Sequence, residues 1–264
     1  MNKCIAEQRQ RILLDMLAAE GSLNATEVAE RLNTTGATVR RDLNKLAEMG
    51  LCKRTHGGAI VLTPANGSVD ERQSQQALEK QSLAATALSL LKPNQLIFID
   101  ASSTNMALAD RMPQDLNLTV VTNSIHIAMS LYNRGAINTI LIGGQIDAAI
   151  GGAVDAKALS DVQMFHFDLM FIGVCAWSQE HGFTALHYPD AQFKRQLLKQ
   201  SGAKVVLFTP DKVETYAPFS LMATADVDYL VCDGASTPDN LTRALAEGGA
   251  HILDSRAGDE QQLR

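Results

Sequence analysis

The sequence predicts an α/β protein of two unequal domains, a small one at residues 1–62 and a larger one at residues 75–254. The first observation is that apolar residues recur at helical spacing three times before residue 50 and are followed by a short alternating segment. The second is that short runs rich in Val, Ile and Leu alternate with helical stretches beyond residue 92, which is typical of parallel strands buried on both faces. A length of 264 residues suits two such domains.

Two helices are expected at the start of the small domain. Residues 7–19 place their apolar side chains on one face, and Gly21 ends this helix. Asn24 is a good N-cap for the second helix, and Glu27 three positions later fits the pattern of a capping box. Both helices therefore present one apolar face to a common core.

A third helix and a wing are expected next. Residues 33–36, N-T-T-G, form the expected turn, and residues 37–49 form a helix that Gly50 closes. Residues 51–61 then alternate in polarity around the glycine pair at 57–58, as a β-hairpin does. Three helices followed by a wing predict a winged helix-turn-helix domain.

Residues 63–74 are expected to link the domains, because Pro, Asn, Gly and Ser cluster between positions 63 and 69. A helical pattern begins at residue 70 and becomes amphipathic toward residue 91. The expected strands of the larger domain are 96–99, 118–121, 139–142, 169–172, 205–208 and 229–231, and the expected crossover helices lie near 105–112, 125–132, 153–160 and 190–200. Residues 255–264 are polar, so a frayed tail is expected there.

The charge of the chain is distributed unevenly. Residues 1–62 hold nine Lys and Arg against seven Asp and Glu, whereas residues 63–264 hold fourteen against twenty-two, for a net charge of −6. A small basic domain thus precedes an acidic one, which favours nucleic acid as a partner of the small domain.

Several classes of protein are disfavoured by composition. No apolar stretch approaches the roughly 20 residues that a membrane span needs. The first ten residues, MNKCIAEQRQ, lack the features of a secretion signal, so we expect a cytoplasmic protein without a membrane partner. The four cysteines are scattered and form no C-x-x-C pair, which favours reduced thiols over disulfides or a zinc site. We therefore expect neither a metal nor a cofactor.

The third expected helix has a cationic face opposite its apolar stripe. In a helix-turn-helix this helix enters the major groove of double-stranded DNA, where Arg pairs with guanine and Asn with adenine, while Lys and Thr hold phosphates. The expected DNA contacts are Thr35, Ala37, Thr38, Arg40, Arg41, Asn44 and Lys45 on the helix and Lys53, Arg54 and His56 on the wing. A solvated face of an ordinary helical bundle and a winged helix that binds protein are the alternatives; the second basic cluster on the wing favours DNA.

The residues of this domain carry a family resemblance. The run T-G-A-T-V-R-R-D-L-N-K-L at 35–46, followed by R-T-H-G-G-A at 54–59, resembles the N-terminal signature of the DeoR family of bacterial transcriptional regulators. The resemblance implies operator binding, usually as a repressor of a sugar-use operon, and a sensor domain for a phosphorylated sugar. Pairing two DNA-binding domains on symmetric half-sites also favours a homo-oligomer.

Three expected strands of the larger domain deliver polar or glycine-containing turns, at 98–104, 120–124 and 141–144. Ligands of open α/β sheets bind where such turns meet, and helix N-termini favour anions. One such turn alone is more often a helix cap or a strand exit, but three of them favour a site. Ser102, Ser103 and Thr104 are suited to cradle a phosphate there.

The resemblance to the DeoR family extends to about residue 233, where it implies a sensor domain similar in fold to ribose-5-phosphate and glucosamine-6-phosphate isomerases. The positions implied to bind the effector are Asp100, Ser102, Ser103, Thr104, Thr122, Asn123, Gly143, Gly144, Gly151, Lys194 and Lys212. Ser102 stands where the family has glycine, Asp190 where Glu is common, and T-P-D-K at 209–212 replaces D-x-S-K. These departures leave the identity of the sugar open.

An enzyme tethered to a DNA-binding domain is the alternative function. It would use Asp100, Asp168 and Lys194 as acid–base groups. The sequence shows no nucleophile or metal constellation, and a similar fold does not transfer chemistry. A regulator without enzymatic activity is therefore favoured.

Overall fold

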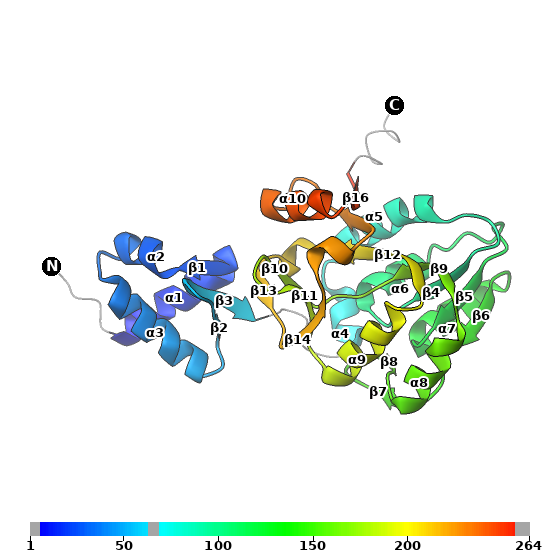
Figure 1. The fold of residues 1–264 in the computed structure, drawn as a ribbon, viewed down its shortest axis with the longest axis horizontal. Helices are drawn as coiled ribbons and strands as arrows, with labels where there is room; N and C mark the ends of the chain where they lie inside the picture. The colour runs from blue at the N-terminus through cyan, green and yellow to red at the C-terminus, as the bar shows by residue number, and fades with distance from the viewer. Residues whose placement is uncertain (1–5, 63–68, 257–264) are drawn as a thin grey trace.

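The computed structural model describes residues 6–62 and 69–256, with a small domain at one end of a larger α/β domain (Figure 1). The elements of the small domain are α1 (Ala6–Glu20), β1 (Ser22–Asn24), α2 (Ala25–Arg31), α3 (Gly36–Glu48), β2 (Lys53–Arg54) and β3 (Gly58–Leu62). Leu13 and Leu17 of α1 meet Val39, Leu43 and Leu46 of α3 in its core. The three helices and the wing are confirmed.

The N-cap expected at Asn24 is present, and Thr35, expected only in a turn, caps α3. Asn24 Oδ1 accepts a hydrogen bond from the backbone N–H of Thr26 at 2.8 Å, and Thr35 Oγ1 accepts one from that of Thr38 at 3.2 Å. The strand β1 was not expected. It pairs with β3, and this close approach requires glycine at position 58, because a Cβ there would lie 1.6 Å from the carbonyl oxygen of Leu23.

The expected linker is partly helical. Residues 63–68 lie outside the described residues, and the rest of the expected linker forms α4 (Val69–Ser74). The single helix expected from residue 70 to 91 is interrupted at Gln76, whose φ of +51° breaks it before α5 (Ala77–Ala87). A 3-10 turn, η1 (Leu88–Leu90), then ends the segment.

The larger domain is built on a seven-stranded parallel sheet in the order β16-β15-β12-β9-β4-β5-β6. Its strands are β4 (Leu96–Ile99), β5 (Thr119–Thr122), β6 (Asn138–Leu141), β9 (Phe167–Phe171), β12 (Ser201–Phe208), β15 (Tyr229–Cys232) and β16 (His251–Asp254). The six expected strands are present, and β16 is an addition that its largely exposed side chains concealed.

Successive residues of each strand enter two separate cores. Ile97 and Ile99 of β4 pack under α5, α6 (Ser103–Ala109) and α7 (Ile125–Arg134), whereas Phe98 packs with residues of α8 (Ala156–Asp161), α9 (Tyr188–Leu197) and α10 (Asp239–Glu247) on the other face. The sheet is therefore covered by helices on both faces, as its unbroken apolar runs require.

Several short strands lie outside the main sheet. β7 (Ile146–Asp147) pairs with β8 (Gly152–Ala153), and a second sheet joins β10 (Ala176–Ser178), β11 (Gly182–Ala185) and β14 (Phe219–Met222). β13 (Thr215–Tyr216) of the larger domain pairs with β3 of the small domain. No helix within the described residues is long and apolar enough to cross a bilayer.

Candidate effector pocket and DNA interface

The strand order creates a reversal between β4 and β9. From β4 the chain proceeds to β5 and β6 on one side, and from β9 to β12, β15 and β16 on the other. Ligands of open parallel sheets bind outside the carboxyl ends of the strands at such a point. Asp100 follows β4 there, and its Oδ2 accepts a hydrogen bond from the backbone N–H of Gly173, which follows β9, at 2.9 Å.

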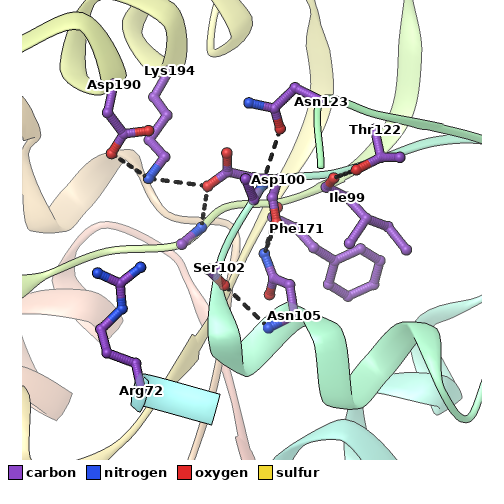
Figure 2. A network of polar contacts seen from close by, with 12 residues as sticks. Arg72, Ile99, Asp100, Ser102, Asn105, Thr122, Asn123, Phe171, Asp190 and Lys194 are labelled. Atoms are coloured by element: carbon purple, nitrogen blue, oxygen red, sulfur yellow. Dashed lines mark hydrogen bonds and ion pairs between the residues drawn. The ribbon is translucent and has the colours of Figure 1, made fainter. Parts of the chain in front are cut away.

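A buried charge cluster lies at this point (Figure 2). Lys194 Nζ of α9 is 3.1 Å from Asp100 Oδ2 and 2.7 Å from Asp190 Oδ2, and all three residues are at most 3% exposed. Burial opposes the charge on Lys194, but the two carboxylates raise its pKa above the ordinary value. Burial, only partly offset by Lys194, raises the pKa of Asp100 to about 7. The cluster thus holds one ammonium between two carboxylates.

A pocket opens beside the cluster, and cationic side chains are among its lining residues. Arg72 of α4, Lys80 of α5 and Lys212 of the turn η3 (Pro210–Lys212) line it. Lys80 Nζ donates hydrogen bonds to Ser103 Oγ at 3.1 Å and to the carbonyl oxygen of Arg72 at 2.5 Å. Burial and the nearby ammonium of Lys212 lower the pKa of Lys80 to about 8, and burial also lowers the pKa of Lys212. These cations repel one another, and Asp211, which also lines the pocket, offsets that repulsion only in part.

Four of the described residues that line the pocket carry a buried side-chain oxygen without a partner. Among the described residues, Gln76 Oε1, Thr104 Oγ1, Asp190 Oδ1 and Thr209 Oγ1 are buried there without a hydrogen-bond partner. A buried polar atom without a partner costs about 1–3 kcal/mol. The lining thus combines cationic side chains with residues whose buried oxygens lack partners.

Part of the expected effector site is assembled here. Ser102, Ser103, Thr104, Lys194 and Lys212 line the pocket. Ser102 also caps α6, since its Oγ accepts a hydrogen bond from the backbone N–H of Asn105 at 3.1 Å. Asp100 lies directly behind the lining and contacts it through Lys194.

The structure does not bring Thr122 or Asn123 into the pocket lining. Thr122 Oγ1 donates to the carbonyl oxygen of Ile99 at 2.6 Å and accepts from the N–H of Ser124 at 3.1 Å. Asn123 bridges two backbone segments, accepting from the N–H of Ala101 and donating to the carbonyl oxygen of Ala153, both at 3.0 Å. Their polar atoms hold the turns around the site and are not directed at a ligand.

The expected glycines are likewise outside the lining. Gly143 and Gly144 lie in a loop that Asp155 holds, and a Cβ at Gly144 would be 2.4 Å from Asp155 Oδ1. Gly151 has φ of +77°, and a Cβ there would lie 2.7 Å from Val69 Cγ1 of α4. Gly144 and Gly151 thus allow close approach between segments of the chain, whereas a Cβ at Gly143 would meet nothing within 4 Å.

Some lining residues were not predicted. They are Arg72, Gln75, Gln76, Lys80, Cys175, His187 and Asp211. Four of them lie on or beside α4 and α5, which follow the chain segment that connects the domains. The spacing of Asp190 four residues before Lys194 was a usable signal, since it places both side chains on one face of a helix.

The enzymatic alternative loses one of its three groups. Asp168 is exposed at the start of β9, and its Oδ2 accepts a hydrogen bond from the N–H of Leu96 at the start of β4. Asp100 follows the carboxyl end of β4, so Asp168 lies at the opposite, amino-terminal end of these strands. The acid–base trio is therefore not assembled.

The expected DNA contacts form a surface on α3 and the wing. Thr35, Ala37, Arg40, Arg41, Asn44, Lys45, Lys53 and His56 are exposed, while Thr38 and Arg54 are half-buried. Arg54 Nε donates to Asn44 Oδ1 at 2.7 Å, so this pair fixes the wing against α3. Asp42 points inward instead and pairs with Arg9 of α1 at 2.5 Å.

Comparison with known proteins decides the family. The model of the DeoR C terminal sensor domain matches residues 75–234, and that of the DeoR-like helix-turn-helix domain matches residues 9–65. The chain belongs to the DeoR family. This DeoR-family protein is a DNA-binding transcriptional regulator with a helix-turn-helix domain and a sensor domain.

Regulators of this family match nearly the whole chain. The HTH-type transcriptional regulator GolR of Listeria innocua is 29% identical, with 86% of this chain and 90% of that protein covered. The L-fucose operon activator of Haemophilus influenzae is 31% identical (89% and 94% covered), and the glycerol-3-phosphate regulon repressor of Escherichia coli is 25% identical (91% and 95% covered). Among solved structures, ribose 5-phosphate isomerase A of Methanocaldococcus jannaschii is 13% identical, with 53% and 55% covered and a TM-score of 0.40.

Proposed function

We propose that this DeoR-family regulator represses a carbohydrate-use operon and that a phosphorylated sugar in the pocket controls it. The observation that carries the proposal is the lining of the pocket, which contains three cationic side chains and four described residues with unpaired buried oxygens. A phosphate dianion matches the first feature and sugar hydroxyls match the second. The L-fucose operon activator and the glycerol-3-phosphate regulon repressor are named for carbohydrate-related systems, which supports the class of effector.

The operator-binding surface in this proposal is α3 with the wing. Arg40 and Arg41 are exposed side by side on α3, and the Arg54–Asn44 hydrogen bond keeps the wing beside them. We infer that the regulator acts as a homo-oligomer in the cytoplasm, because two such surfaces on symmetric half-sites multiply a modest affinity. We also infer that the larger domain senses its ligand without converting it, since Asp168 lies away from Asp100 and Lys194.

The test is a thermal-shift screen of the full chain against phosphorylated sugars and their unphosphorylated counterparts. A ligand that binds only the native state stabilises it by RT ln(1 + L/Kd), where L is the ligand concentration, so the melting temperature rises with the logarithm of that concentration once it exceeds Kd. We expect stabilisation by one or more sugar phosphates and none by the matching sugars. Equal stabilisation by both members of each pair would refute the phosphate requirement.

Variants then assign the site. Thr104→Ala and Lys212→Ala are expected to lose the response to the sugar phosphate while keeping ligand-free operator binding. Thr122→Val is the control, because it also removes a threonine hydroxyl, but one that does not line the pocket. The Kd of this variant for the sugar phosphate should stay close to that of wild type once the stability of the variant is taken into account. Wild-type ligand binding by both Thr104→Ala and Lys212→Ala would place the effector elsewhere.

A further inference from the structure

One short segment connects the pocket to the DNA-binding domain. Lys212 lines the pocket at the end of η3, and β13 begins three residues later. β13 pairs with β3 in parallel, with Thr215 opposite Val61 and Tyr216 opposite Leu62. Figure 1 shows β13 at the border of the two domains, next to β3. Residues 210–216 therefore touch the ligand site at one end and the wing at the other.

The segment is held as a stiff unit. The N–H of Lys212 donates to the carbonyl oxygen of Thr209 at 3.2 Å, and Thr215 Oγ1 donates to the carbonyl oxygen of Lys212 at 2.9 Å. Between them, Val213 forms a bridge to Trp177, which is fully buried, and Glu214 has a φ of +48°. The backbone between the pocket and β13 is therefore tied together by contacts at almost every residue.

The other end of the segment contacts a side chain expected to bind DNA. Lys53 Nζ of the wing lies 4.9 Å from the centre of the Tyr216 ring, a cation–π arrangement. The Tyr216 ring is also in edge-on contact with His181, which fixes its plane. Lys53 is exposed, and the same ammonium is the group expected to contact a DNA phosphate. The docked wing thus joins an expected phosphate contact to β13.

Contacts of the small domain with this segment continue beyond the wing. Gly21, at the end of α1, packs against the carbonyl oxygens of Val213 and Glu214, where a Cβ would come within 3.3 and 3.2 Å. The docked surface therefore includes both the helical part of the small domain and its wing. A shift of residues 213–216 would alter both contacts together.

We propose that residues 210–216 carry the effector signal: a phosphate drawn to Lys212 shifts η3 and β13, and this changes the docking of β3 and the availability of Lys53. The inference rests on the proposed function, because it takes the pocket to be the effector site. It adds the physical route by which that site biases the DNA-binding domain. A ligand acts through such a route only if it binds one arrangement better than the other.

Hydrogen–deuterium exchange of the full chain, with and without inorganic phosphate, tests the route directly. We expect phosphate to change the exchange of residues 210–216 and also of residues 58–62, which lie in the other domain. Lys212→Gln should abolish both changes. Lys199→Gln, which removes an exposed lysine outside the pocket, should leave both unchanged.

A second arm uses Tyr216→Leu, which retains an apolar side chain but lacks the ring. With a sugar phosphate identified by the thermal-shift screen, wild-type operator affinity should change by a factor of about 5 or more, the low end of typical coupling. In Tyr216→Leu this factor should fall toward 1, while the Kd of the sugar phosphate stays near that of wild type. Lys53→Gln removes the ammonium and keeps the Tyr216 ring, so it measures separately how much the Lys53–Tyr216 contact contributes to this factor.

The outcomes separate the two proposals. If neither phosphate nor any sugar phosphate binds, the proposed function fails and the route fails with it. If a ligand binds and exchange at residues 58–62 does not respond, the route is wrong and the effector site stands. A full operator response in Tyr216→Leu would equally overturn the route. Loss of ligand binding in that variant would overturn it too, because Tyr216 would then act on the pocket.

Discussion

Replacing Lys194 by methionine should strongly destabilise the sensor domain. The substitution keeps the length of the side chain but removes the ammonium that lies 3.1 Å from Asp100 and 2.7 Å from Asp190. Two carboxylates that are at most 3% exposed would then lack their cation. Breaking a buried ion pair by removing one partner costs about 3–5 kcal/mol, and we expect a loss of that size in the free energy of unfolding at pH 8.

The loss should depend on pH in a defined direction. The pKa of Asp100 is about 7 in the folded protein, above its ordinary value of 3.8, so the native state keeps a proton that the unfolded chain releases. This group therefore lowers stability as pH rises from about 4 to about 7. Without Lys194 the pKa of Asp100 rises further, and the decline extends to higher pH. The defect of Lys194→Met should be larger at pH 8 than at pH 6.

The assay is urea unfolding followed by the fluorescence of Trp177, the single tryptophan, which is fully buried in the sensor domain. Lys199→Met is the matched control, since Lys199 is exposed just after α9 and its loss should change stability by less than about 0.5 kcal/mol. A loss below about 1 kcal/mol for Lys194→Met at pH 8, or a larger defect at pH 6, would refute the account of this cluster.

Three further predictions concern other parts of the chain. Gly58→Ala should disrupt the pairing of β1 with β3 and abolish operator binding, because its Cβ would lie 1.6 Å from the carbonyl oxygen of Leu23; tryptophan-detected unfolding of the sensor domain should not change. Arg40→Ala/Arg41→Ala should weaken operator binding by at least about 1–3 kcal/mol and, if both contact phosphates, flatten the slope of log K against log salt by about 2 in binding titrations. Asp100→Asn should lose less stability than wild type between pH 5 and pH 8, as measured by urea unfolding, because the titrating group is gone.

Matched controls sharpen these three tests. Gly57→Ala should be tolerated, because a Cβ there meets only Asn24 Nδ2, at 3.9 Å. Lys92→Ala/Lys199→Ala removes the same charge from the exposed surface of the other domain and should leave the salt slope nearly unchanged. Asp115→Asn removes an exposed carboxylate and should retain the wild-type pH profile. Equal effects of a variant and its control would contradict the corresponding prediction.

The sequence predicted those parts of the fold that depend on local patterns. The helix cap at Asn24 follows from a short side chain that satisfies a free N–H group at a helix start. The bounds of β4 agree with the expected residues 96–99, because a run of four large apolar residues fits a strand buried on both faces. The three-residue β1 and the two-residue β13 carry no such pattern, since their partner strands come from distant parts of the chain.

The candidate effector site was likewise predicted only in part from the sequence. The sequence by itself determined that Ser102–Thr104 starts a helix after a strand, and this local geometry puts three polar residues at the pocket. Only the tertiary structure decided that Arg72 and Lys80 join them, because α4 and α5 reach the pocket by packing against α6. It also decided that Asp168 lies at the amino-terminal end of the strands, away from the pocket, and that the polar atoms of Asn123 form hydrogen bonds with the backbone. A residue's type and spacing limit the chemistry it can perform, but strand order and packing determine which residues share a site, because these depend on contacts between segments that are far apart in the chain.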